Sequence, residues 1–290
     1  MGWRGAPHDL RTMTDVVRLT LRASLDQSIE IHGLTPDRVA TLSEIEIAGL
    51  TVLAGSRRAS LGDFFTVSGE RSDRLRIEGD LHHLDGLGAG TAGGELLLEG
   101  SAGRRIGAGM TGGWIDVRGD AGDDAGVGMQ GGALRITGDA GGRLGAALPG
   151  ASKGMTGGEI VVNGSAGPDA AARVRRGLIA VGGDVGAGAA RAIIAGTLVV
   201  FGRTGAAPGR GSKRGSIVAL GPIEIPSTYE YACTYQPTYV RMLLTYLHRR
   251  YGVASPEGAL DGPYARYCGD AGAPGKGEIL AYTPGSRTPG

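Results

Sequence analysis

Residues 114–119 read Trp-Ile-Asp-Val-Arg-Gly, and residues 133–138 read Ala-Leu-Arg-Ile-Thr-Gly, which is the same alternating pattern 19 positions later. The closing glycine returns at this interval through the middle of the chain, with one longer gap of 26 residues. It is found at Gly100, Gly119, Gly138, Gly164, Gly183, Gly202 and Gly221. A constant period of about 20 residues is typical of a stack of similar structural units. This repeat therefore decides the fold class before any local motif is considered.

Each repeat is predicted to begin with a short strand. Branched aliphatic residues stand four and two positions before the closing glycine, as in Ile115 and Val117. Residues two apart point to the same side of a strand, so each repeat supplies one inward pair. The residue between them faces outward, and in the later repeats it is apolar. These outward residues form a predicted stripe of Val161, Ala180, Val199 and Val218.

Glycines also recur between the strands, which predicts recurrent sharp corners because glycine tolerates left-handed backbone angles. A strand, a corner, a short segment and a second corner describe one coil of a β-helix. We predict an all-β fold, a right-handed parallel β-helix that forms a glycine-rich solenoid of about eight coils. Stretches such as residues 107–113 look like phosphate-binding loops, but they return with the repeat. A dinucleotide-binding fingerprint occurs once, between a strand and a helix.

The gap of 26 residues fits one repeat of 19 plus an insertion of seven, which we place at residues 148–154. Met155 then takes the same repeat position as Met110 and Met129. We expect these three methionines to form a packing ladder inside the stack.

The chain divides into four predicted segments. Residues 1–15 form a loose N-terminus, residues 16–74 a small α/β leader, residues 75–221 the coils, and residues 222–290 a C-terminal helix and tail. The leader carries a strand at 17–22 and two short helices, the first with Thr35 as N-cap before Pro36 and the second with the capping box Ser43 and Glu46.

The C-terminal segment has one predicted helix, from Thr238 to Tyr251, which Gly252 closes. Its apolar side carries Val240, Leu243, Leu244 and Leu247. We expect this helix to cover the outward stripe. The stripe could otherwise serve as a surface for a partner protein.

Composition excludes several classes of protein. The chain has 290 residues, 56 of them glycine, and a formal net charge of +1, so its overall charge favours neither nucleic-acid nor membrane binding. Two cysteines do not make a disulfide scaffold. No apolar run approaches the length of a membrane span or a signal peptide. We therefore expect a cytoplasmic protein.

Three groups of residues have side chains suited to chemistry: His82-His83 beside Asp80 and Asp85, the cysteines Cys233 and Cys268, and the acidic pair Asp123-Asp124. Adjacent histidines on a strand point to opposite faces and rarely bind one ion, so a solvated loop is favoured over a metal site. The cysteines lack ligand spacing and are expected to be buried structural thiols. The acidic pair is expected at a solvated corner. We predict no catalytic residue and no metal ligand in this chain.

One charged pattern follows the repeat. Basic residues recur eight, nine, eleven and twelve positions after the closing glycines, when the insertion is left out of the count. We expect few acidic residues beside them. They are Lys153, Arg173, Arg175, Arg176, Arg191, Arg210, Lys213 and Arg214. Equivalent positions stack in a solenoid, so these side chains are expected along one edge. Stacked like charges repel, which favours an acidic partner or an anion at this edge, although a solvated edge that resists aggregation is an equal alternative.

The repeat resembles the β-helical C-terminal domain of glutamate synthase large subunits. Over nearly the whole chain it is similar to the C subunits of formylmethanofuran dehydrogenases, and most similar to the bacterial version of that family, the C subunits of formyltransferase/hydrolase complexes. The segments that carry this match are Leu34-Thr-Pro-Asp-Arg38, Leu61-Gly-Asp-Phe-Phe-Thr-Val-Ser-Gly69, Tyr264-Ala-Arg-Tyr-Cys-Gly-Asp270 and Gly275-Lys-Gly-Glu-Ile-Leu280. Cys268 departs from the small polar residue that is usual in the family.

The resemblance implies a non-catalytic scaffold subunit in one-carbon metabolism. In such a complex, formyl transfer from formyl-tetrahydromethanopterin and zinc-dependent hydrolysis of the formylmethanofuran-type carrier belong to the other components: an amidohydrolase-like A subunit, a B subunit and a formyltransferase D subunit. The carrier has an acidic polyglutamyl tail, which the basic residues are expected to contact, unless they meet an acidic face of a neighbouring subunit. Two alternatives are the C subunit of a molybdenum- or tungsten-dependent formylmethanofuran dehydrogenase and a free-standing glutamate-synthase-like domain.

Overall fold

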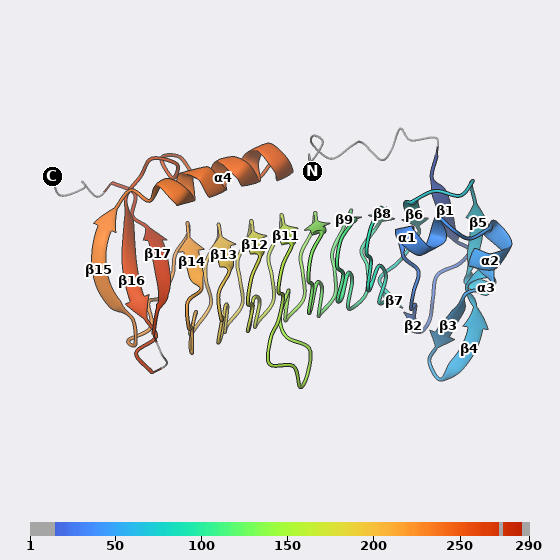
Figure 1. The fold of residues 1–290 in the computed structure, drawn as a ribbon, viewed down its shortest axis with the longest axis horizontal. Helices are drawn as coiled ribbons and strands as arrows, with labels where there is room; N and C mark the ends of the chain where they lie inside the picture. The colour runs from blue at the N-terminus through green and yellow to red at the C-terminus, as the bar shows by residue number, and fades with distance from the viewer. Residues whose placement is uncertain (1–14, 273–274, 286–290) are drawn as a thin grey trace.

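The computed structural model describes residues 15–272 and 275–285. A long row of parallel strands runs through the molecule, with the helical N-terminal elements at one end and three longer strands at the other (Figure 1). Helix α4 (Thr238–Tyr251) lies lengthwise over the row.

The main sheet has 13 strands in the order β15-β16-β17-β14-β13-β12-β11-β10-β9-β8-β6-β1-β5. Its repeat strands are β6 (Arg74–Glu78), β8 (Glu95–Glu99), β9 (Trp114–Val117), β10 (Ala133–Ile136), β11 (Glu159–Val162), β12 (Leu178–Val181), β13 (Thr197–Val200) and β14 (Ser216–Ala219). Strands β1 (Val17–Leu21) and β17 (Gly277–Tyr282) extend this row in parallel at its two ends.

Consecutive repeats pair residue for residue. In β9 and β10, Ile115 is the register partner of Leu134, which is the residue 19 positions later. A second parallel ladder of isolated bridges runs from Leu81 through Ala102 and Ala121 to Thr204. Each repeat therefore contributes one step to two ladders, as a coil stacked on the next coil does.

The interior of the stack is filled by the predicted apolar residues. The inward pairs, such as Ile115 with Val117, are fully buried. Met110, Met129 and Met155 are also fully buried, which confirms the methionine ladder. Their methyl groups lie so close to glycines of the following coil that a Cβ on Gly132 would come within 2.7 Å of the Met110 Cε. The methionine of one coil thus requires a glycine in the next.

The N-terminal elements include those that the sequence predicts, together with others. Strand β1 is present, as are α1 (Pro36–Val39) and α2 (Glu44–Ala48), and α2 has the Ser43–Glu46 capping box. Thr35 takes the extended N-cap backbone, but its side chain does not cap the helix. The remaining elements were missed: α3 (Leu61–Phe64), β5 (Phe65–Ser68), and a four-stranded sheet of β4 (Arg57–Ser60), β3 (Thr51–Ala54), β2 (Ile29–Glu30) and β7 (Leu84–Asp85). The predicted loose segment falls, but for Asp15, outside the described residues.

Helix α4 covers the outward stripe, as predicted. Val161, Ala180, Val199 and Val218 form one buried cluster with Val240, Leu244 and Leu247 of the helix. Gly252 closes α4 in the left-handed conformation, with φ of +73°. The stripe is therefore a second core of this chain, outside the coils.

Two carboxylates hold the ends of α4. Glu159 accepts hydrogen bonds from the hydroxyls of Tyr246 and Tyr251, while Glu278 accepts one from Tyr239. Both carboxylates occupy the same register row, four strands apart, which is about 19 Å. Tyr239 and Tyr251 are 12 residues apart on the helix, which is about 18 Å. The helix therefore matches the length of the row that it spans.

The last three strands were not predicted. After β14 the chain forms β15 (Glu230–Tyr235), α4, β16 (Tyr264–Gly269) and β17, and β17 pairs in parallel with β14 as one further step of the stack. Strands β16 and β15 add to it in antiparallel fashion. Cys233 is exposed on the edge strand β15 and Cys268 is half-buried, so the prediction of two buried thiols was wrong.

Two alanine substitutions separate packing from backbone strain. Gly132 and Gly150 both have φ of +80°. A Cβ on Gly132 would lie 2.6 Å from the Gly112 carbonyl oxygen, whereas a Cβ on Gly150 has no neighbour within 4 Å. We expect Gly150→Ala to lower the free energy of unfolding by about 1–2 kcal/mol from strain alone, and Gly132→Ala by a further 1–3 kcal/mol or so from overpacking. Urea denaturation measures both, and equal losses would contradict the close approach of the coils.

The Glu159 anchor gives a second prediction. Glu159→Ala removes the acceptor of two tyrosine hydroxyls and the ion-pair partner of Arg250, whose Nε lies 3.3 Å from a Glu159 oxygen. We expect a loss of about 1–3 kcal/mol and faster amide exchange at residues 246–252. Glu257→Ala, at an exposed side chain in the loop that follows α4, is the control and should leave that exchange unchanged. Equal exchange in both variants would rule out an anchoring role for Glu159.

Candidate functional site

The eight predicted basic residues are all exposed, and four of them lie on one row of backbone hydrogen bonds. The amide of Gly154, next to Lys153, donates to the Arg173 carbonyl, and the Arg173 amide donates to the Arg191 carbonyl. The Ala192 amide then donates to the carbonyl of Arg210. Lys153, Arg173, Arg191 and Arg210 therefore follow one another from coil to coil along one edge.

The other four residues lie on a parallel row that is interrupted. Arg175 and Arg176 both donate their amides to the Met155 carbonyl. The next coil carries the uncharged Ile194 and Ala195 at this position. Basic residues resume one coil later, at Lys213 and Arg214.

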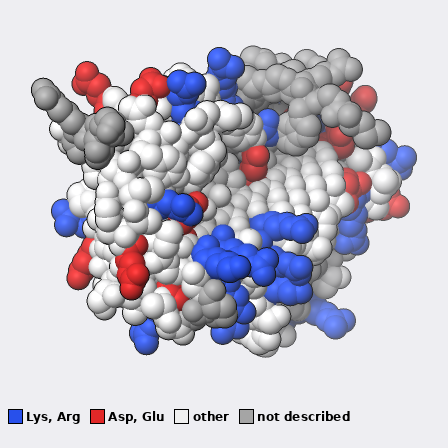
Figure 2. Space-filling model, turned by 60° about the vertical axis from the view of Figure 1, so that its left-hand side comes forward, with Lys and Arg blue, Asp and Glu red and all other residues white. Residues whose placement is uncertain are grey.

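Lys276 extends this second row and was missed by the sequence analysis. Its amide donates to the Lys213 carbonyl, because β17 continues the stack. The sequence repeat does not extend to β17, so the position of Lys276 on this row follows only from the pairing of β17 with β14. In Figure 2, Lys and Arg side chains gather in a dense patch below a smooth uncharged surface.

Acidic residues are present at this edge, contrary to the sequence expectation. Asp169 accepts a hydrogen bond from Arg191 Nε at 2.8 Å, and this contact raises the pKa of the Arg191 guanidinium above its ordinary value. Asp270, which is 4% exposed, accepts hydrogen bonds from the amides of Gly211 and Gly272, and the charge of Arg210 contributes to lowering its pKa. The carboxylates of Asp169 and Asp270 are fewer than the basic side chains of the two rows, so this edge carries a net positive charge.

The predicted solvated corner at Asp123-Asp124 is also corrected. Asp124 is 5% exposed and forms a two-pronged ion pair with Arg143 of the next coil, with distances of 2.6 Å and 2.5 Å. This carboxylate raises the pKa of Arg143, chiefly through the hydrogen bonds. Asp123 instead accepts the amide of Gly142. Side chains one coil apart lie next to each other in a solenoid. The 19-residue spacing of Asp124 and Arg143 could therefore have predicted their ion pair.

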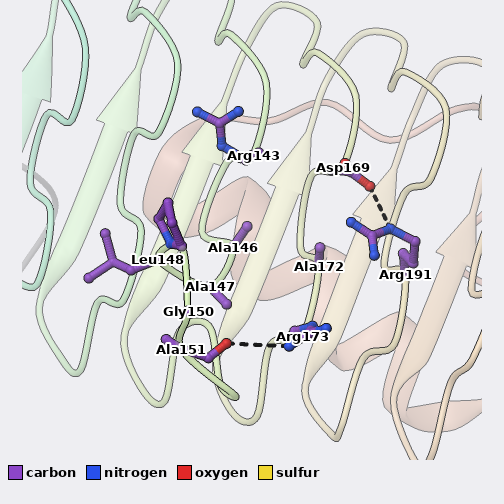
Figure 3. A pocket seen from close by; sticks show the side chains of 11 residues that line it. Arg143, Ala146, Ala147, Leu148, Gly150, Ala151, Asp169, Ala172, Arg173 and Arg191 are labelled. Carbon is purple, nitrogen blue, oxygen red and sulfur yellow. Dashed lines mark hydrogen bonds and ion pairs between the residues drawn. The ribbon is translucent and has the colours of Figure 1, made fainter.

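The seven-residue insertion forms one wall of a pocket at the first basic row. The cavity has a volume of about 210 Å³. It is lined by Arg143, Arg173, Arg191 and Asp169, by the alanines Ala146, Ala147 and Ala172, and by loop residues 148–151. Figure 3 shows the three guanidinium groups spread around the small alanines. Sequence reasoning placed the insertion correctly but did not assign Arg143 to the site.

The remaining candidate residues form no second site. His82 contacts Asp80, which lowers the pKa of that carboxyl, and its ring lies against His83. Within the described ranges, no group of three or more His, Cys, Asp and Glu side chains could hold a metal ion. No helix in the described part of the chain is long and apolar enough to cross a bilayer.

Rows of arginine and lysine are suited to binding anions. A guanidinium presents a planar fork of donors that matches a carboxylate or a phosphate, while an ammonium acts as a point charge. The fold and this edge together define a stacked-coil protein with an anion-binding edge and a helix that covers its outer stripe.

Comparison with known proteins identifies the family. No family model matches the chain. The chain is similar to a protein in the crystal structure of the formyltransferase/hydrolase complex from Methylorubrum extorquens in complex with methylofuran, with 38% identity and a TM-score of 0.84. The match covers 92% of this chain and 99% of that one. The chain therefore belongs to the family of C subunits of formyltransferase/hydrolase complexes and formylmethanofuran dehydrogenases.

Sequence comparison alone finds shorter matches to the same family. The C subunit of the Methylorubrum extorquens complex is 38% identical over 88 residues, which are 30% of this chain and 33% of that protein. The C subunit of tungsten-containing formylmethanofuran dehydrogenase 2 from Methanothermobacter thermautotrophicus is 35% identical over 94 residues, which are 31% of this chain and 34% of the relative. The chain thus spans about a third of the length of the curated relatives in these alignments.

Asp270 gives a testable pH dependence. The hydrogen bond from the Gly211 amide is the main cause that lowers the pKa of Asp270 below its ordinary value of about 3.9. A lowered pKa in the folded state stabilises the protein above pH 3.9 or so, and this contribution is lost as the pH falls through the lowered value. We expect Asp270→Asn to lower stability near pH 7 by about 1–3 kcal/mol and to flatten its dependence on pH between about 2 and 5. Urea midpoints measured across this range test it, and parallel curves for both proteins would contradict it.

Proposed function

We propose that this chain is the non-catalytic scaffold subunit of a formyltransferase/hydrolase complex. In the proposed complex, the sibling A, B and D subunits convert formyl-tetrahydromethanopterin to formate through a formylated methanofuran-type carrier. The observation that carries the proposal is the match along 99% of a chain in the methylofuran-bound bacterial complex. A scaffold role is also supported by the form of the molecule, because a stack of coils offers long faces on which several proteins can dock.

The finer features of the architecture belong to the same proposal. We infer that the coils wind in the right-handed sense of a parallel β-helix, because right-handed crossovers are strongly preferred between parallel strands. The leader at residues 16–74, the coils at 75–221 and the C-terminal segment at 222–290 are proposed as its functional divisions. The cytoplasm is its proposed location.

The basic rows are the proposed contact for the acidic tail of the carrier or an acidic face of a sibling subunit. The donor chemistry fits either, since exposed Arg and Lys side chains attract carboxylates over long range and pair with them at contact. Arg175, Arg176, Lys213 and Arg214 suit this role because all four side chains are exposed, while the amides of Arg175, Arg176 and Lys213 are bonded to the preceding coil. Zinc is proposed to reside in a sibling subunit.

The alternative is the C subunit of a molybdenum- or tungsten-dependent formylmethanofuran dehydrogenase. The similarity of 35% to the corresponding part of the tungsten enzyme supports it, but the alignment covers only 94 residues. The match over the whole length favours the hydrolase complex.

Purification from the native host tests the proposal. We expect the tagged chain to retain three sibling subunits, zinc and the carrier, and the complex to release formate. Molybdenum or tungsten with iron–sulfur would support the alternative, and a chain that is active alone would contradict both. Reversal of Arg175, Arg176, Lys213 and Arg214 to Glu is expected to reduce the carrier or subunit content at least tenfold. Reversal of Arg57 and Arg58, exposed on β4 in the leader, is the control and should leave the content unchanged.

A further inference from the structure

A second cavity lies beside α4, and none of the eight basic residues lines it. After Gly252 the chain turns back and runs along the helix before it enters β16 at residue 264 (Figure 1). The space between this return segment, residues 253–263, and the helix has a volume of about 450 Å³. That volume falls within the range of about 300–1,000 Å³ that is usual for sites of small ligands. We call this cavity the α4 pocket.

The return segment is fixed in place by hydrogen bonds. The hydroxyl of Tyr282 donates to the Glu257 carbonyl at 2.9 Å, and the buried hydroxyl of Tyr264 donates to the Ala259 carbonyl at 2.7 Å. Gly258 turns the segment with φ of +75°, where a Cβ would lie 2.8 Å from the Tyr282 hydroxyl oxygen. The α4 pocket is therefore formed before a ligand arrives, which reduces the conformational entropy that is lost on binding.

The α4 pocket has apolar walls on both sides. Leu244, which is fully buried, lines it from the helix, and Leu260, which is 41% exposed, lines it from the return segment. Ala254 and Pro256 add further apolar surface. An exposed leucine beside a cavity offers apolar area that an aliphatic chain of a ligand removes from water.

The polar groups of the α4 pocket are predominantly acceptors. The hydroxyl of Thr245 already donates its proton to the Arg241 carbonyl, at 2.8 Å. His248 Nδ1 lies 3.3 Å from the Val253 carbonyl oxygen, so this nitrogen carries the proton and Nε2 is left as an acceptor in the neutral ring. Asp261 is neutralised by an ion pair with Arg241 at 3.0 Å. A ligand of this pocket must therefore supply hydrogen-bond donors.

Glu257 gives the α4 pocket one free negative charge. Among residues 15–272 and 275–285, its carboxylate has no hydrogen bond and no ion pair. No lysine or arginine is found among the described residues that line the cavity. A free carboxylate beside apolar walls attracts a cation that also has an apolar stem. These two conditions describe an ammonium group at the end of an aliphatic chain.

We propose that the α4 pocket binds the side chain of a lysine that another protein presents. The methylene chain of the lysine packs against Leu244 and Leu260, and its ammonium donates to the Glu257 carboxylate. An ammonium has donors only, which complements the acceptors of the pocket. The single free carboxylate favours this monocation over a free polyamine, whose other charges would be left without partners.

The lysine cannot come from this chain. Its three lysines, Lys153, Lys213 and Lys276, all lie on the basic rows. The occupant is therefore a second protein, and the site does not depend on the proposed scaffold function.

Three small probes separate the contributions of charge and apolar contact. Nα-acetyl-lysine methylamide carries the lysine side chain without a charged backbone. Nα-acetyl-norleucine methylamide has nearly the same aliphatic chain without the ammonium, and spermidine represents the free polyamines. Leucine-methyl NMR of the full-length chain follows binding of each, because Leu244 and Leu260 both line the pocket.

We expect the lysine probe to shift the methyl signals of Leu260 with a dissociation constant in the millimolar range, and the norleucine probe to bind at least about threefold more weakly. Glu257→Gln keeps the shape of the side chain and removes its charge. This variant should weaken binding of the lysine probe at least about threefold and leave the norleucine probe unaffected. Glu224→Gln, at an exposed carboxylate outside the pocket, is the matched control and should change neither.

Several outcomes would overturn the proposal. Equal binding of the lysine and norleucine probes would show that the ammonium makes no contact, and equal lysine binding by Glu257→Gln and the native chain would exclude the carboxylate. Tighter binding of spermidine would assign the pocket to polyamines in place of a protein lysine. Methyl signals of Leu260 that do not move with any probe would refute the site altogether. Urea midpoints of both variants should match that of the native chain, so that a lost response is not a consequence of unfolding.

Discussion

The structure depends on the approach of backbone to backbone at the corners of the coils. A Cβ on Gly119 would lie 2.6 Å from the amide nitrogen of Ser101, and one on Gly122 would lie 2.9 Å from the Gly103 carbonyl carbon. Only glycine permits this approach. Because the corners are so close, consecutive strands pair in register and their inward aliphatic residues align into a continuous core. The in-register strands, the apolar interior and the methionine ladder all depend on this steric constraint.

The same constraint decides where the molecule can carry charge. Side chains inside the coils must be apolar, and the outer stripe of the later coils is occupied by α4. Charged side chains are therefore confined to the turn positions before each strand. At these positions, a residue of one coil lies directly over the equivalent residue of the next coil. Basic side chains at these positions therefore add up along the edge. The insertion before Met155 disturbs this regular edge once, and the pocket lies where it does so.

Much of the fold could be predicted from the sequence because the constant repeat length assigns each residue a position within its coil. The repeat strands, the glycine corners between them, the buried methionines and the covering of the stripe by α4 were predicted from spacing and hydrophobic pattern. The strands after residue 222 were missed because their pairing is long-range and carries no period. The burial of Asp124 was missed because a carboxylate looks solvated until its partner in the next coil is considered. The left-handed backbone of Arg173 was missed because no residue pattern displays a backbone angle.

Helix α4 changes how cooperatively the stack of coils unfolds. In a simple solenoid each coil contacts only its two neighbours, so coils can fray one at a time from an open end. Here one helix touches β11, β12, β13 and β14 together and is tied to Glu159 and Glu278 at its two ends. Opening any of these coils exposes part of a surface that all of them share. The four coils under α4 should therefore unfold together as one cooperative unit and not one after another.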